Sequence, residues 1–448
     1  MFRFSMKRPA PPLRVFLRSA VIIFLGLSCT VVAYSAVIGA NPPAQPLTRG
    51  RIASLPAPQR HIWSVYLDRS LKQRTADQTV LHSELKAAGL AEPLEPPHGS
   101  AVRSIPLDRA ASWYAQPEAL RIGDIIVSFQ TPAGGWSKNI DMSREPRRPG
   151  EAFAADNLSR FPSAGDYDAP AEPNWNYVGT IDNDATTTQL HFLAKLVAAI
   201  RDDSRAQRYR AAFLRGADYL FAAQYPGGGW PQVWPLEGGY HDAITYNDGA
   251  MVHVIELMRR LADGSGEFAF VPKAIRKRAA ASFDRALDCI LSTQIVSNGK
   301  RTVWPQQADP LTLEPVSARN YEPPAEASCE SVAILQLLMN ISLPTATQRQ
   351  AIRAAAAWFR KTAIYGQQWQ PTPAGRDIVA VPGAGPIWAR YYQIGADQPV
   401  FADRDKSIHD KVRDISKERR NGYQWYCADP QQALDRFQQW SKDYPETQ

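Results

Sequence analysis

Residues 240–251, YHDAITYNDGAM, place polar side chains that can bind a ligand directly before an apolar helical pattern. These side chains are His241, Asp242, Asn247 and Asp248. One interpretation is that Asn247 or Asp248 caps the following helix, because a side-chain oxygen there accepts from free backbone N–H groups at the positive helix end. The other is a binding site, which is favoured because similar polar stretches precede other helices in this chain.

A second polar stretch, residues 180–188 (TIDNDATTT), also leads into a helical pattern. Thr180 or Asp182 could cap that helix. Alternatively, Asp182 and Asp184 supply oxygen ligands for a hard cation such as Ca²⁺. Acidic residues at positions i and i+2 are a weak calcium signal, and the EF-hand spacing is absent from the sequence.

Arginines flanked by aromatic residues form a third set, at Arg319, Arg390 and Arg404. A guanidinium beside a ring can hold a carboxylate through two hydrogen bonds while the ring stacks. Each of these arginines could instead form an ordinary surface ion pair, which contributes little to stability.

Several reaction classes are disfavoured because their motifs are missing from the sequence. There is no GxxxxGK[ST], no strand-linked GxGxxG, no GxSxG and no HExxH. Acid–base chemistry by two carboxylates on a sugar remains open.

The elements that must position these residues read as helices. Seven amphipathic segments are predicted, at residues 110–130, 188–201, 206–224, 250–261, 272–293, 328–340 and 345–365. Three of them end in related turns: Gln130 precedes GGW, Gln224 precedes GGWPQ, and Gln294 precedes WPQQ. This internal repeat predicts an all-α fold, an α/α toroid of helical hairpins whose long loops form a substrate cleft.

The first 105 residues are predicted to lie outside this fold. Residues 1–40 combine a basic start with an apolar run and small residues, which indicates a signal peptide or, if uncleaved, a signal anchor. Residues 41–105 read as an extension made of a Pro-rich linker and one helix over 60–91, and residues 106–448 as the toroid.

Charge and cysteine content restrict the class of protein further. The chain carries 51 basic and 44 acidic side chains, a net charge of +7, but five of the basic ones and none of the acidic ones lie in residues 1–40. The remainder is therefore close to neutral, which gives no support to nucleic-acid binding. Cys289, Cys329 and Cys427 follow the leader; Cys289 and Cys329 could pair, and an odd number leaves at least one thiol free or paired between chains.

Seven motifs in order resemble the pectate lyases of polysaccharide lyase family 10, over roughly residues 107–426. They are GGWSKN at 134–139, TIDNDAT at 180–186, GGWPQ at 228–232, ITYNDGAM at 244–251, WPQQ at 304–307, ARNYEPP at 318–324 and FADRD at 401–405. The resemblance implies an α/α toroid that cleaves polygalacturonate by Ca²⁺-assisted β-elimination. It departs at Lys406, where Gly is frequent, and at Val233-Trp234, which puts subsite preference in doubt more than activity.

The resemblance also implies roles for single residues. Asp182 and Asp248 fall on acidic calcium and active-site positions, and Arg319 falls on the catalytic base. Lys138, Arg390 and Arg404 fall on contacts to the substrate carboxylates. The expected substrate-binding set also contains Asn183 and Trp230.

We therefore expect a secreted or periplasmic, monomeric, calcium-dependent pectate lyase with no nucleic-acid partner and no membrane contact beyond an uncleaved leader. Two alternatives remain. One is an α/α-toroid hydrolase that uses Asp182 and Asp248 as an acid/base pair on uronic sugars. The other is a non-catalytic pectin-binding protein with the same cleft.

Overall fold

The computed structural model describes residues 37–155, 165–168, 177–200 and 204–446. Residues 35–448 form one compact unit. The predicted signal segment lies almost wholly outside the described residues. Within the described ranges, none of the helices combines the length and the apolar character needed to cross a bilayer.

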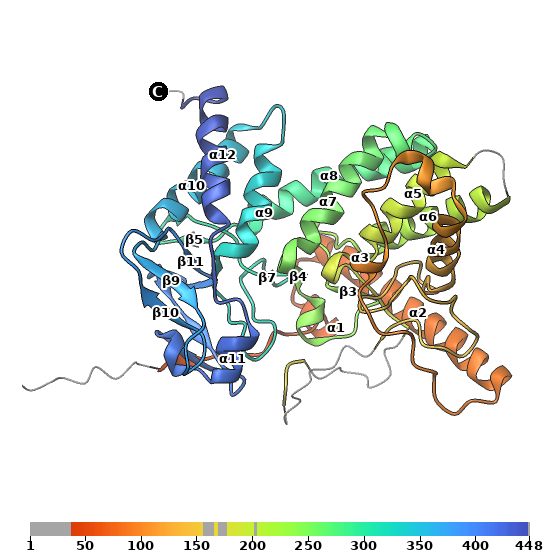
Figure 1. Cartoon of the computed structure of the whole chain (residues 1–448), viewed down its shortest axis with the longest axis horizontal. Coiled ribbons are helices and arrows are strands. Elements are labelled where there is room, and N and C mark those ends of the chain that lie inside the picture. Colours follow the sequence, from red (N-terminus) through yellow and green to blue (C-terminus); the bar gives the residue numbers. More distant parts are fainter. Residues whose placement is uncertain (1–36, 156–164, 169–176, 201–203, 447–448) are drawn as a thin grey trace, which may run out of the picture. The chain divides into compact units, whose positions relative to one another are not determined.

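Six of the seven helices predicted for the toroid are present with small shifts at their ends (Figure 1), whereas the segment predicted over 110–130 is a short 3-10 helix (Ala111–Ala115) followed by α4. The helices are α1 (Arg49–Ala53), α2 (Ala57–Ala88), α3 (Ala101–Ser104), α4 (Pro117–Ser128), α5 (Thr187–Ala199), α6 (Ser204–Ala223), α7 (Ala250–Asp263), α8 (Lys273–Thr293), α9 (Ser328–Met339), α10 (Ala346–Thr362), α11 (Lys417–Gly422) and α12 (Pro430–Asp443). The sequence patterns did not predict α1, α3, α11 and α12.

The helices from α5 to α10 are arranged as two layers of an α/α toroid. The helices α5, α7 and α9 contact one another in turn, and so do α6, α8 and α10, while α5–α6, α7–α8 and α9–α10 pack as hairpins. Nine of the twelve residues of α9 are buried, against seven of 21 in α8. The layer of α5, α7 and α9 is therefore the inner one, and the all-α toroid prediction is confirmed.

The repeated turns after the outer helices share the same hydrogen bonds. Each glutamine amide donates to a carbonyl of its own turn and to a carbonyl of the next outer helix: Gln130 to Gly134 and Ala212, Gln224 to Gly228 and Ser282, and Gln294 to Thr302 and Ala351. Each following indole N–H donates back to the preceding helix: Trp136 to Ile126, Trp230 to Leu220, and Trp304 to Ile290. The repeat predicted from the sequence therefore appears in the structure as the same set of hydrogen bonds in each turn.

Glycine is required in these turns for two reasons. Gly228 has a φ of 97°, and a Cβ there would lie 2.0 Å from the Arg285 carbonyl oxygen. Gly134 has a φ of 105°, and a Cβ there would lie 2.6 Å from the Arg215 carbonyl oxygen. Only glycine combines that backbone angle with so close an approach.

Short antiparallel strands connect each inner helix to the following repeat. The strand before α5, β2 (Gly179–Thr180), pairs with β3 (Val233–Trp234). The strand before α7, β4 (Ile244–Thr245), pairs with β7 (Gln307–Ala308). The strand before α9, β8 (Glu326–Ala327), pairs with β12 (Tyr391–Gln393). These pairs fix the polar stretches at the N-terminal ends of the inner helices.

The other strands lie in small sheets and hairpins. They are β1 (Val37–Ala40), β5 (Val296–Ser297), β6 (Lys300–Arg301), β9 (Gln367–Gln370), β10 (Asp377–Ala380), β11 (Trp388–Ala389), β13 (Gln398–Pro399), β14 (Phe401–Ala402), β15 (Ser407–His409) and β16 (Tyr426–Cys427). The sheet β1-β15-β14 joins the described start of the chain to its C-terminal part.

Residues 41–105 pack on the toroid, although their first part reads as a linker in the sequence. Trp63, Tyr66 and Leu67 of α2 belong to the main hydrophobic core, and the Tyr66 hydroxyl donates to the Ala223 carbonyl at 2.8 Å. The helix predicted over 60–91 is α2, which ends at Gly89 in the left-handed conformation. The division into an extension and a catalytic toroid stays a prediction.

The cysteines pair differently from the sequence expectation. Cys329, in the first turn of α9, is bonded to Cys427 of β16, and Cys289 is buried as a free thiol. Cys289 lies in α8 beside Tyr246, whereas β16 is brought to α9 through its pairing with β11. The suggested Cys289–Cys329 pair is therefore wrong, because connectivity follows the fold and not the spacing.

The buried carboxyl group of Glu326 on β8 leads to a testable prediction about how stability depends on pH. Its side chain is fully buried, and burial, with a further contribution from the Asp397 carboxylate, raises its pKa to about 7. The folded state therefore holds a proton that the unfolded chain releases near pH 4.5, so stability falls as pH rises from about 4.5 through 7. Glu326→Gln removes this ionisation. We therefore expect the change in unfolding free energy caused by the substitution to be more stabilising above pH 8 than at pH 4.5, by on the order of 2 kcal/mol.

Chemical denaturation at both pH values measures this difference. Asp218→Asn, at an exposed ion pair with Arg278, controls for the loss of a surface carboxylate. An equal effect of Glu326→Gln at the two pH values would mean that folding does not raise the pKa of Glu326.

Candidate active site

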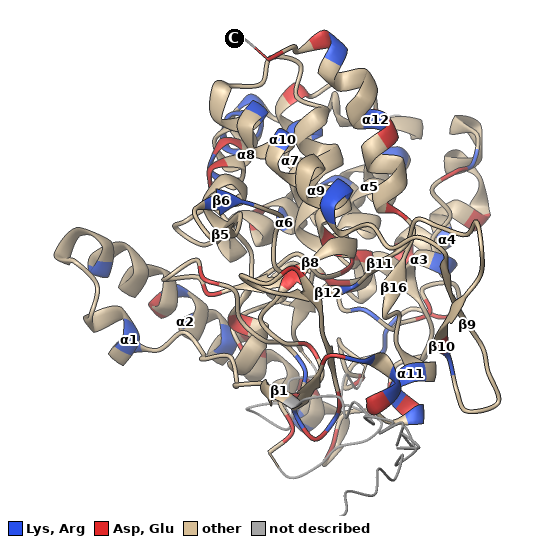
Figure 2. Cartoon of the chain, turned by 90° about the vertical axis from the view of Figure 1, so that its left-hand side faces the viewer, with Lys and Arg blue, Asp and Glu red and all other residues tan. Residues whose placement is uncertain are grey.

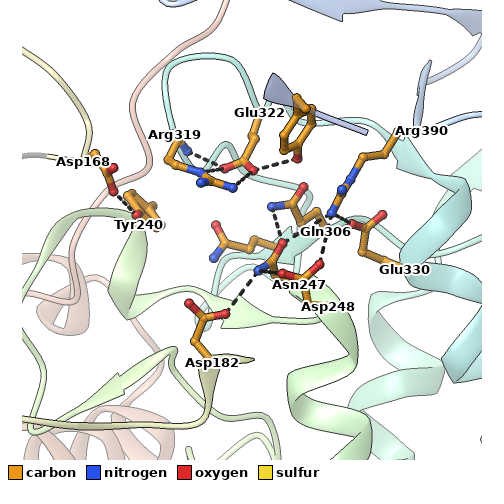
Figure 3. Close-up of polar contacts among 12 residues, drawn as sticks. Asp168, Asp182, Tyr240, Asn247, Asp248, Gln306, Arg319, Glu322, Glu330 and Arg390 are labelled. Carbon is orange, nitrogen blue, oxygen red and sulfur yellow. Dashed lines mark hydrogen bonds and ion pairs between the residues drawn. The ribbon is translucent and has the colours of Figure 1, made fainter. Parts of the chain in front are cut away.

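A cavity of about 470 Å³ opens among the loops that precede α5 and α7, the 306–322 loop and the 404–423 segment. Six of the predicted site residues line it: Lys138, Asp182, Asn183, Asp248, Arg319 and Arg404. Arg390 lines a neighbouring cavity of about 280 Å³, and Asp248 borders both. Figure 3 shows Asp182, Asp248, Arg319 and Arg390 among these groups, which converge from separate parts of the chain.

Two equivalent turns supply the polar groups at the floor of the cavity. Asp182–Asp184 and Asn247–Gly249 are single turns of 3-10 helix whose middle residues, Asn183 and Asp248, have φ angles of 50°. Asn and Asp tolerate this left-handed conformation better than other non-glycine residues. The turn buries its first side chain, Asp182 or Asn247, and exposes the second.

The helix-cap interpretation of these turns is wrong. The N-cap positions are Thr186 for α5 and Gly249 for α7, and neither makes a side-chain cap bond. Asn247 instead donates to Asp182 Oδ1 at 3.3 Å and to Asp248 Oδ2 at 3.0 Å. The side chains face the cavity and each other, not the helix ends.

Asp182 is buried, and its surroundings favour its ionised form. Its Oδ2 forms an ion pair with Lys138 Nζ and accepts from Gln232 Nε2 at 2.9 Å. Burial alone would raise its pKa, but the Lys138 charge and these hydrogen bonds outweigh burial and lower it. Asp184, which the sequence offered as a second ligand, pairs instead with His253 on α7.

Arg319 is held by a carboxylate three residues later. Its Nε donates to Glu322 Oε2 at 2.9 Å and its Nη2 to Glu322 Oε1 at 2.5 Å. The Tyr423 hydroxyl donates to the same carboxylate at 2.7 Å. Burial would lower the pKa of Arg319, but Glu322 outweighs burial and holds it well above its usual value. Burial acts oppositely on Glu322, yet Arg319 lowers the pKa of that carboxyl to about 2.

Arg390 and Arg404 are also held by glutamates. Arg390 is buried and pairs with Glu330 of α9, and its Nη2 lies 3.6 Å from Asp248 Oδ1. Arg404 donates from Nε to Glu418 Oε2 at 2.8 Å, and Glu418 also binds Arg419. Helix α11 carries three basic residues and one acidic residue, Glu418 (Figure 2).

Trp230 does not reach the cavity. Its side chain is fully buried in the core, where the indole N–H donates to Leu220. Its predicted contact with substrate is therefore replaced by a packing role, which it shares with Trp136 and Trp304.

A protein-family model for pectic acid lyases matches residues 130–434 of this chain. The chain belongs to the pectic acid lyase family. A search of curated proteins found no match.

Two solved structures are similar to this lyase. A family 10 polysaccharide lyase from Cellvibrio cellulosa is 29% identical, with a TM-score of 0.61 over 76% of this chain and 97% of that one. An Asp-to-Ala mutant of a family 10 polysaccharide lyase from Cellvibrio cellulosa, in complex with trigalacturonic acid, is 28% identical, with a TM-score of 0.61 over 77% and 99% of the two chains. The predicted family, fold and pectate lyase activity are confirmed.

Several functional residues of the lyase were not predicted from its sequence. Gln232 and Gln306 occupy equivalent places in the Trp-Pro-Gln turns and donate to Asp182 and Asn247, the first residues of the two equivalent turns. The repeated Trp-Pro-Gln motif in the sequence could have identified these two glutamines. Glu330 and Glu418 gave no comparable signal, because their arginine partners are 60 and 14 residues away.

The carboxylates in the cavity could supply only part of the coordination shell of a hard cation. Asp182 and Asp248 offer carboxylate oxygens on one cavity, joined by the Asn247 amide. In the described part of the chain, no group of three or more His, Cys, Asp or Glu side chains could hold a metal ion. Ca²⁺ takes six to eight oxygen ligands, so substrate and water would have to complete its shell.

Proposed function

We propose that this pectate lyase cleaves polygalacturonate by calcium-assisted β-elimination, with Arg319 as the base. The observation that carries the proposal is the common cavity: Arg319, Asp182 and Asp248 border the same space, with Lys138 and Arg404 beside them. The trigalacturonic acid complex of the related lyase supports a polyuronate substrate.

The reaction breaks a carbon–oxygen bond without water. The base takes the proton from C5, the C4–O4 bond breaks, and a C4–C5 double bond forms while the released oxygen gains a proton. A bound Ca²⁺ supplies positive charge to the C6 carboxylate, which makes the C5 proton more acidic. Asp182 and Asp248 would hold that ion.

The chain's own cations orient the substrate. Lys138 and Arg404 lie where they can bind uronate carboxylates, and Arg390 can bind one at the adjoining cavity. The exposed Asn183 can hydrogen-bond a sugar hydroxyl. The glutamate partners keep the guanidinium planes of Arg390 and Arg404 fixed before substrate arrives.

Arg319 is protonated in the resting enzyme, because Glu322 raises its pKa. Among the described residues, its Nη1 has no hydrogen-bond partner, so this nitrogen is the one offered to C5. Loss of its proton must be favoured in the complex by neighbouring cations and by alkaline conditions. We expect kcat to rise with pH between about 7 and 10, approaching about tenfold per unit, as one deprotonation requires. A pH–rate profile of kcat measures this; a flat profile or an acidic optimum would indicate a carboxylate base.

The hydrolase alternative fits the site less well. It needs one carboxyl group to act as an acid, and acids in such sites have raised pKa values. The pKa of Asp182 is instead lowered. Digestion of polygalacturonate in oxygen-18-labelled water separates the two reactions. Elimination adds no water to the products, whereas hydrolysis adds one labelled oxygen for each bond broken, in one of the two new ends; products heavier by one water per cleavage would refute the lyase mechanism.

We also propose that the lyase is exported, to the periplasm or the medium, and acts as a monomer. The basic and apolar residues 1–40 support export. The Cys329–Cys427 disulfide supports an oxidising compartment.

A further inference from the structure

The segment that follows β1 reaches the loop that carries Arg319, although it precedes the family match at residues 130–434. Asn41 comes directly after β1 and is almost completely buried. Its Nδ2 donates to the carbonyl oxygens of Arg319 at 3.0 Å, Asn320 at 3.0 Å and Glu322 at 3.3 Å. One amide group thus contacts three carbonyl groups of the single turn that holds the arginine and its carboxylate partner.

The turn that Asn41 binds is closed by its own backbone. Ala318 N donates to the Glu322 carbonyl at 3.0 Å, and Glu322 N donates to the Arg319 carbonyl at 2.9 Å. The backbone N–H of Arg319 also donates to Glu322 Oε2 at 3.0 Å. These bonds make the place of the Arg319 guanidinium depend on the shape of the turn.

Asn41 also joins this turn to the hairpin that carries Arg404. Its backbone N–H donates to the Lys406 carbonyl at 2.7 Å, which continues the β1–β15 pairing. From the turn side, Asn320 Nδ2 donates to the Arg404 carbonyl at 2.8 Å. Asn41 therefore lies at the junction of the two loops that carry the proposed base and a proposed carboxylate-binding arginine.

The chemistry of the contact requires an amide donor. Three carbonyl oxygens face the end of the side chain, and the carboxamide NH2 group has two N–H donors, so it can satisfy more than one of them. A carboxylate of the same size would bring like partial charges together in a buried place. Removal of the side chain would leave buried carbonyls without this partner.

We propose that Asn41 is a positioning residue for the elimination reaction, whose carboxamide holds the 318–322 turn so that Arg319 faces the cavity; this inference rests on the proposed role of Arg319. Asn41 does not touch substrate. It acts through the backbone of the turn.

Four variants of the full chain test the role of Asn41. Asn41→Ala removes the donor, and Asn41→Asp replaces it with an acceptor of equal size. Ser317→Ala is a milder change at the same junction, because it removes only the hydrogen bond from Ser317 Oγ to the Pro42 carbonyl. Arg51→Ala is the matched control: it breaks an ion pair between the same N-terminal segment and Asp309, away from the turn.

The measurements are kcat and KM for the unsaturated product from polygalacturonate, with the denaturation midpoint of each variant. We expect Asn41→Ala to lower kcat by about 30-fold or more, with KM changed less than about threefold, because a small misplacement of a catalytic group costs up to about 10²-fold. Asn41→Asp should lower kcat at least as much, and Ser317→Ala by about three- to tenfold. Arg51→Ala should keep kcat within about twofold of the wild type.

Wild-type kcat in Asn41→Ala, or an equal loss in Arg51→Ala at the same loss of stability, would overturn the positioning role. If Asn41→Ala does not fold, an unchanged kcat in Ser317→Ala overturns it. Failure of the proposed function shows separately, because the wild-type enzyme would then form no unsaturated product in the same assay.

Discussion

Arg319→Ala is expected to lower kcat on polygalacturonate by about 10³-fold or more while KM changes by less than about fivefold. The loss follows from removing the base, since a positioned proton acceptor contributes about 10²- to 10⁴-fold. Substrate binding persists because Lys138, Arg390 and Arg404 remain. Initial rates of unsaturated product, together with calorimetric binding of a galacturonate oligomer, measure the two effects separately.

Arg319→Lys refines this test. Lysine has a lower intrinsic pKa than arginine but cannot form the two-bond fork to Glu322, so it should stay at least about 10²-fold below the wild type. Arg278→Ala, at an exposed ion pair, is the control and should leave kcat unchanged. If Arg319→Ala keeps kcat within about tenfold of the wild type, another group is the base.

Asp182→Asn should lower kcat/KM by about 10²-fold or more and raise the calcium concentration needed for half-maximal activity. The substitution keeps the size of the side chain but removes a charged ligand, and hard cations are bound through charged oxygens. It also leaves the half-buried Lys138 without its carboxylate partner. Rates measured over a series of buffered calcium concentrations separate the two consequences.

Asp218→Asn at the surface provides the matched control for this substitution. A loss of activity with an unchanged calcium requirement would contradict the ligand role and leave Asp182 as the partner of Lys138 only.

The parts of the fold that sequence patterns predict are the long helices, in which apolar residues recur over several turns. The apolar spacing of α7 and α8 located both helices within two residues, because each buries one continuous stripe. The pairs β2–β3 and β4–β7 escaped prediction, because two-residue strands have no periodicity. These strands pair because the toroid places neighbouring helical hairpins side by side, and this arrangement is not visible in any short stretch of sequence.

Some residues of the candidate site could likewise be predicted from the sequence, and others could not. Asp182, Asp248 and Arg319 stand in polar motifs whose residue types already suggest ligands, and the structure brings them to one cavity. Trp230 stands in an equally prominent motif, but its place in the repeat puts it in the core. Asn41 lies in a Pro-rich stretch, where no local pattern shows that its amide meets a turn 278 residues away.

The most direct test of the account is the ultraviolet absorbance of polygalacturonate incubated with the purified lyase at alkaline pH, first with calcium and then with a chelator. The account predicts that absorbance rises as C4–C5 double bonds form, that the chelator stops the rise, and that added calcium restores it. New reducing ends without absorbance, or a rise that persists in the chelator, would contradict calcium-assisted elimination.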